Sequence, residues 1–65
     1  GASSMANEER IALLRDMIKV RRVAAASAAD RYAKSTLSFY LDDMRSLDKE
    51  CIELQDQIEK LQRGA

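Results

Sequence analysis

The chain has 65 residues, with 11 Lys and Arg against 11 Asp and Glu, no histidine, no proline and a single cysteine. A chain this short rarely buries enough apolar surface to be stable alone, and one cysteine without histidine excludes both an internal disulfide and a structural zinc site. No apolar run is long enough to span a bilayer, and no signal peptide is visible. About half of the residues are Ala, Glu, Lys, Leu or Arg, which is typical of coiled coils. Association of helices is therefore the expected source of stability.

The chain is expected to open with an unstructured segment and to continue as one helix. Residues 1–6 begin with GASSM, which has the composition of a cloning remnant, so disorder is predicted there. Asn7 can cap a helix, and the two glutamates that follow it suit the positive end of the helix dipole. Gly64 is the expected stop. Since no glycine or proline lies between these signals, a continuous coiled-coil helix is predicted over residues 7–63.

The spacing of apolar residues changes along this helix. Residues 11–43 fit an eleven-residue repeat, whose rows begin at Ile11, Leu14 and Ile18. Residues 44–61 fit a heptad repeat instead. Eleven-residue repeats favour straight or slightly right-handed supercoils, whereas heptads favour left-handed ones. The heptad seam consists of Met44, Leu47, Cys51, Leu54, Ile58 and Leu61.

The predicted fold is all-α, with a single long helix that forms a coiled-coil dimer. The N-terminal half of this helix is hendecad-like, and the C-terminal half is a heptad coiled coil. A helical hairpin is the alternative, with its bend near residues 27–31. Ser27 and Asp30 permit a turn there, although glycine and proline are missing from the segment.

The orientation of the two chains stays open, with a slight preference for the parallel pair. A parallel pair brings two Cys51 side chains into one layer, where oxidation can join them. An antiparallel pair instead matches residues whose numbers add up to 72, such as Ile18 with Leu54. Charge favours the antiparallel pair, because residues 1–34 have seven Lys and Arg against four Asp and Glu. Residues 35–65 have four against seven, so the two halves carry opposite net charges of three.

A basic cluster in the N-terminal half supplies the candidate binding residues. At about 100° per residue, three of them fall on one side of the seam and two on the other. Such a surface can attract an acidic polymer, for which microtubules and a nucleic-acid backbone are the candidates, but it can equally be a solvated face that keeps the helix soluble. Nucleic acid is the weaker candidate, because the chain is neutral overall and KVRR is sparser than a DNA-reading basic region. The candidates are Arg15, Lys19 and Arg22 on one side, and Arg10 and Arg21 on the other.

A second apolar stripe lies roughly opposite the seam of the N-terminal half. A simple two-stranded coil would expose it, so it indicates either packing in a larger bundle, docking of a partner helix, or scattered surface residues. The stripe consists of Leu13, Met17, Val20 and Ala24.

Catalysis, cofactor binding and metal binding find no support in the sequence. Histidine, glycine-rich loops and metal-spaced clusters are all missing, so the chain is not expected to be an enzyme. Cys51 is expected to be a small core residue rather than a reactive thiol. No membrane partner is expected either.

KVRR, the alanine-rich helix after it and the heptad tail together resemble the coiled-coil, microtubule-binding segment of an unconventional kinetoplastid kinetochore protein. The resemblance is one of layout and length over residues 6–65. It implies that the five basic candidates contact the acidic microtubule surface. The expected function is a coiled-coil dimerisation module of a cytoskeletal or kinetochore-type protein, located at the cytoskeleton or in the nucleus. The alternatives are a pure oligomerisation or partner-docking scaffold without polymer binding, and a binder of the nucleic-acid backbone.

Overall fold

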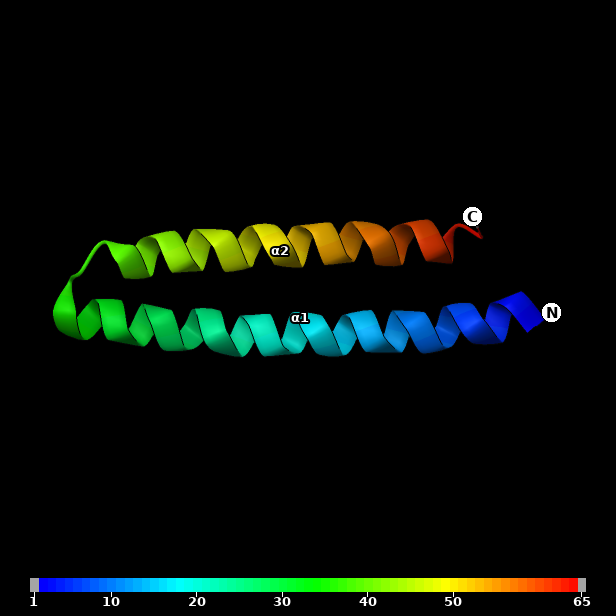
Figure 1. The fold of residues 1–65 in the computed structure, drawn as a ribbon, viewed down its shortest axis with the longest axis horizontal. Coiled ribbons are helices and arrows are strands. Elements are labelled where there is room, and N and C mark those ends of the chain that lie inside the picture. The colour runs from blue at the N-terminus through cyan, green and yellow to red at the C-terminus, as the bar shows by residue number, and fades with distance from the viewer. Residues whose placement is uncertain (1, 65) are drawn as a thin grey trace.

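The chain folds into an antiparallel helical hairpin in a computed structural model that describes the backbone of residues 2–64 and the side chains of residues 6–64 (Figure 1). Helix α1 spans Ala2–Ser35 and helix α2 spans Phe39–Gln62. The molecule is a rod of 52 × 15 × 10 Å. The prediction of an all-α fold is confirmed. One uninterrupted helix is not formed in this structure, because the chain reverses direction at residues 36–38 and its two halves pack on each other.

Helix α1 begins earlier than the sequence predicted. The helix starts at Ala2 rather than at Asn7, so residues 2–6 are helical, and only Gly1 of the segment expected to be disordered lies outside the described residues. Alanine has the highest helix propensity, and no glycine or proline follows Gly1 to end the helix before its first turn. The five-residue segment at 27–31, where the alternative hairpin was expected to bend, is helical for the same reason.

The turn uses a threonine in a backbone conformation that usually belongs to glycine. Thr36 has φ +57°, the left-handed region, and its N–H donates to the carbonyl of Tyr32 at 2.7 Å. This single bond is the left-handed closure of a helix C-terminus. Hydroxyl groups satisfy the freed backbone nearby: Ser35 Oγ donates to the Arg31 carbonyl at 2.8 Å. Helix α2 then starts after Ser38, whose carbonyl accepts from the backbone N–H of Leu41 at 3.0 Å.

The end of α2 follows the predicted signal. Arg63 N–H donates to the Glu59 carbonyl at 3.0 Å, and Gly64 N–H donates to the Leu61 carbonyl at 3.2 Å. Gly64 has φ +77°, a conformation that glycine adopts without steric strain. Helix α2 ends at Gln62, and Gly64, the expected stop, directly follows the C-cap residue Arg63.

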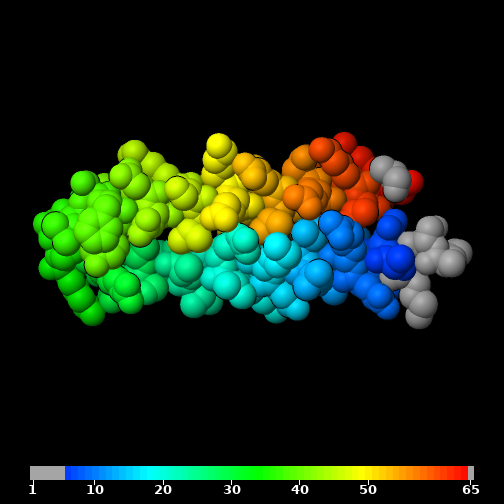
Figure 2. Space-filling model, viewed as in Figure 1, coloured from blue at the N-terminus to red at the C-terminus, as the bar shows by residue number. Residues whose placement is uncertain are grey.

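The core is a short apolar seam between the two helices. Its buried cluster consists of Leu14 and Ile18 from α1 and Leu54 and Ile58 from α2. These are two of the pairs whose residue numbers add up to 72, so the antiparallel register considered for two chains is formed within one chain. Figure 2 shows the side chains of the two helices in contact along the rod. Partly buried hydrophobic residues extend the cluster: Ile11, Met17, Cys51 and Leu61.

Four of the six predicted heptad positions of α2 belong to this seam or pack against it: Cys51, Leu54, Ile58 and Leu61. Leu54 and Ile58 are buried, and the other four of the six are half-buried. The α2 residues of the predicted heptad seam are thus buried or half-buried, and α1 of the same chain covers the buried ones. Neither described helix is long and apolar enough to cross a membrane.

Candidate functional site

Three of the predicted binding residues line a groove between the helices, which we call the basic groove. Its volume is about 580 Å³, and Ile18 and Ile58 of the buried cluster form part of its wall. Helix α1 supplies the cations on one lip, because residues spaced four and three apart share one face of a helix. Helix α2 supplies two amides and a carboxylate on the other lip. The polar lining residues are Arg15, Lys19 and Arg22 from α1, and Gln55, Glu59 and Gln62 from α2.

The cations of the basic groove have no ion-pair partner among residues 6–64. Each ion pair recorded there involves a different cation, and three of the four are local, between residues four apart in one helix. Glu59, the one carboxylate that lines the groove, lies 3.7 Å from Arg63 in the next turn of its own helix. Arg15, Lys19 and Arg22 are all exposed. The groove therefore has three cations against one carboxylate, which gives it a net positive charge.

Arg21 has a different environment from the three groove cations. Its Nε lies 3.5 Å from Glu50 Oε1, an ion pair between α1 and α2, but this buried nitrogen has no hydrogen-bond partner among the described residues. Another guanidinium nitrogen donates to the Met17 carbonyl at 3.1 Å. The Arg21 side chain is only 27% exposed, and it contacts both its own helix and Glu50 of α2. Arg10, the fifth candidate, is exposed and lies one turn before Leu14, the first buried residue of the seam. The structure therefore brings together three of the five predicted residues.

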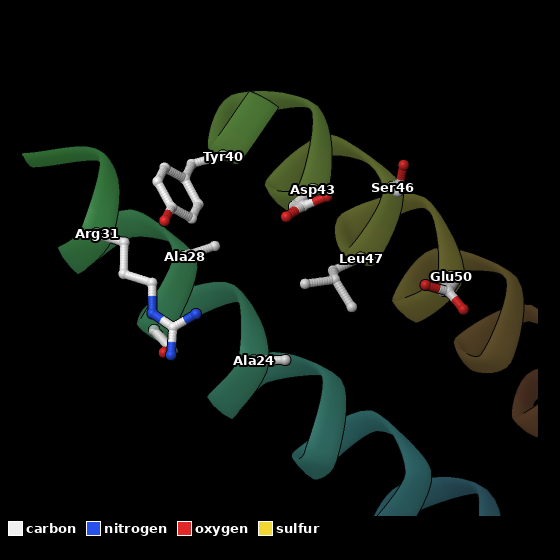
Figure 3. Close-up of a pocket in the computed structure, with 9 residues that line it drawn as sticks. Ala24, Ala28, Arg31, Tyr40, Asp43, Ser46, Leu47 and Glu50 are labelled. Carbon is white, nitrogen blue, oxygen red and sulfur yellow. The ribbon is translucent and has the colours of Figure 1, made fainter. Parts of the chain in front are cut away.

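A second groove opens beside Arg21, on the other flank of the seam. Small side chains of α1 create it: Leu47 points from α2 into the space beside Ala24 and Ala28 (Figure 3). The groove holds about 400 Å³ and is lined by both charges, with Arg31 on α1 and Asp43 on α2. Because its charges are mixed, it offers no net attraction to a polyanion.

The second apolar stripe is only partly available to a partner. Met17 is half-buried and packs against the seam cluster. Leu13 and Val20 are exposed at 58% and 66%, and Val23 beside them is exposed at 71%. The stripe therefore remains as an exposed apolar face on the outside of α1.

Sequence reasoning missed the α2 side of the basic groove. Gln55, Glu59 and Gln62 are spaced four and three apart, which places them on one flank of α2. This spacing was the available signal, but a groove between these residues and the α1 cations forms only when the two helices pack together. Among the described residues, no group of three or more His, Cys, Asp or Glu side chains could hold a metal ion.

Comparisons with protein-family models, with curated proteins and with solved structures find no match for this chain. The geometry of the hairpin and the charge of its grooves are therefore the basis on which a function is proposed.

Proposed function

We propose that this chain is a coiled-coil interaction module that joins two copies of itself and contacts an acidic protein polymer of the microtubule type through the basic groove. One observation carries the contact with a polymer: Arg15, Lys19 and Arg22 are exposed on one lip of a groove and have no ion pair within residues 6–64. Cations without a local partner keep their attraction for an external anion, over a screening length of about 8 Å at physiological ionic strength.

The charge distribution of the hairpin supports a contact through α1. Helix α1 has seven Lys and Arg against four Asp and Glu, whereas α2 has three against seven. If the acidic residues of α2 faced the cations of α1 throughout, the hairpin would neutralise itself. Instead, one pair, Arg21 with Glu50, crosses between the helices in the described part of the chain, and the groove cations stay free.

The small core supports the pairing of two chains. Five hydrophobic side chains of the described residues are buried, and one of them is only an alanine. Helical modules with so little core commonly gain stability by association. A parent protein of the kinetochore or cytoskeleton type stays a prediction, and so does a location at those structures.

Cosedimentation with microtubules across a salt series tests the polymer contact. Replacing Arg15, Lys19 and Arg22 together with glutamine should weaken binding about tenfold at low salt, since each exposed charge contact contributes about 0.2–1 kcal/mol. Binding of the unmodified chain should fall steadily as salt rises. A DNA duplex, added as a competitor in a parallel series, shows whether any polyanion occupies the groove equally well.

The matched control removes three cations from the outer face of α2, by replacing Arg45, Lys49 and Lys60 with glutamine. This variant has the same net charge as the groove variant, and its binding should stay within about twofold of the unmodified chain. Equal losses in the two variants would mean that only net charge matters. No binding at low salt would leave the alternative, a pairing scaffold without polymer binding.

A further inference from the structure

The turn of the hairpin lies at the midpoint of the seam's register. The buried cluster contains both members of the pairs Leu14–Ile58 and Ile18–Leu54, and the numbers of each pair add up to 72. Half of 72 is 36, and Thr36 is the first residue of the turn. The seam is therefore symmetric in sequence about the residue at which the chain reverses.

A seam with this symmetry can close in two ways. In the hairpin, α2 folds back on α1 of the same chain. In the other arrangement, two straight chains lie antiparallel with a two-fold axis near Thr36, and α2 of each chain packs on α1 of the other. Each seam contact of the hairpin, including Arg21 with Glu50, can then form between the two chains in the same register. Exchange of an identical element between copies is a common route to dimers.

The turn favours the straight arrangement by its own strain. Thr36 is β-branched, and a left-handed backbone costs such a residue roughly 1–2 kcal/mol. Residues 36–38 contain neither glycine nor proline, so their sequence permits a helix that continues from α1 into α2. Straightening relieves the strain at Thr36 and restores helical backbone hydrogen bonds across the turn.

In a straight helix, the seam residues of α1 and those of α2 also lie on one face. Counting by eleven from Leu14 passes through Ala25 and Thr36 and arrives at Leu47. Leu14 is buried and Ala25 and Leu47 are half-buried in the hairpin, so this row belongs to the seam on both sides of the turn. An eleven-residue repeat has about 3.67 residues per turn, close to the straight helix, and needs little supercoiling to hold its face.

We propose that two copies of this chain exchange α2 by opening at residues 36–38, and pair as straight antiparallel helices in the register of the hairpin. The partner is a second copy of this chain, and the interface is the seam itself. The inference rests on the proposed pairing of two chains and specifies how they pair. Each exchanged dimer then has two basic grooves, one on either side of the two-fold axis and about 50 Å apart at 1.5 Å per residue.

Spin labels within one chain distinguish the two closures. Ala12 and Lys60 are exposed on α1 and α2, and their numbers also add up to 72. Both are replaced with cysteine in a Cys51→Ser chain, labelled, and refolded with an excess of unlabelled chain. The hairpin keeps a short distance, on the order of 20 Å, because packed helices lie 8–10 Å apart. The exchanged dimer shows about 70 Å instead, from 48 residues of helix.

Analytical ultracentrifugation of the same samples at rising concentration gives the mass of the particle. It shows whether the exchange of α2 or the pairing of two chains has failed. A dimer with the long intrachain distance supports exchange. A dimer with the short distance would overturn exchange and leave the pairing of two chains intact. A monomer at every concentration would overturn both.

Variants of the turn at residues 36–38 provide an independent test of the exchange. Replacing Thr36 and Ser38 with alanine favours the helical linker and should tighten the dimer about tenfold, whereas Thr36→Gly relieves the hairpin's strain and should weaken it by a similar factor. Equal dimer affinity in the two variants would contradict an opening at the turn.

Discussion

Removal of apolar atoms from the seam should destabilise the protein far more than the same removal from the outside of α2. Ile58 is 7% exposed and Ile52 is 65% exposed, and the two lie on one helix, six residues apart. Replacing either with alanine removes three carbon atoms, for which burial contributes about 0.8 kcal/mol each. Scaled by the buried fraction of each side chain, the loss is about 2 kcal/mol for Ile58→Ala and under about 1 kcal/mol for Ile52→Ala.

The comparison of the two variants isolates burial from helix propensity. Alanine is the better helix former by the same few tenths of a kcal/mol at both positions, so this gain cancels in the difference. For a domain of this size, about 1 kcal/mol shifts the melting temperature by roughly 4–8 °C, so Ile58→Ala should melt well below Ile52→Ala. Circular dichroism at 222 nm gives the melting temperature of each variant during heating and its free energy of unfolding during urea titration. Equal melting temperatures for the two variants would refute the placement of the seam on the Ile58 face.

Two further predictions concern the contacts between the helices. Glu50→Gln removes the ion pair to Arg21, whose buried Nε has no hydrogen-bond partner among the described residues, and should cost about 0.5–1 kcal/mol in urea unfolding, whereas Asp30→Asn, which breaks a local exposed pair, should cost less than half of that. Similar urea midpoints for the two variants would show that the Arg21–Glu50 ion pair contributes nothing to stability. Cys51 lies in the seam with Sγ 4.0 Å from the Ile18 carbonyl, so mild oxidation under native conditions should give no disulfide-linked dimer on a non-reducing gel, while oxidation in urea should. Ready native crosslinking would indicate a parallel pair.

The sequence predicted which residues of α2 are buried but not which helix buries them. The heptad positions from Met44 to Leu61 are strongly periodic, and periodicity depends only on local spacing. Whether α1 of the same chain or of another covers them depends on a turn, and the turn here lacks glycine and proline. Residues 35–38 include three hydroxyl side chains, which favour local bonds to the backbone, and this was the signal that the sequence offered.

For the candidate site too, the sequence predicted local positions on one helix but not the contacts between the two helices. The cations Arg15, Lys19 and Arg22 were predicted to share one side of the seam, and they line one groove. Arg21 was expected to be a binding residue, and its ion pair with Glu50 depends on the register of the two helices, which the sequence left open. Local spacing was therefore sufficient to predict which cations share one face of α1. The contacts of Arg21 could be predicted only from the way the two helices pair.

The hairpin begins and ends at the same end of the rod, since α1 starts where α2 finishes (Figure 1). A force applied to the two ends of one chain therefore pulls the helices apart sideways and loads the seam one layer at a time, starting from Ile11 and Leu61. Such unzipping needs little force, because few contacts resist at any moment. In the exchanged dimer the same two ends lie at opposite ends of the rod, and tension along the helices shears the whole seam at once. The same sequence thus resists tension weakly as a hairpin of one chain and strongly as an exchanged dimer of two chains.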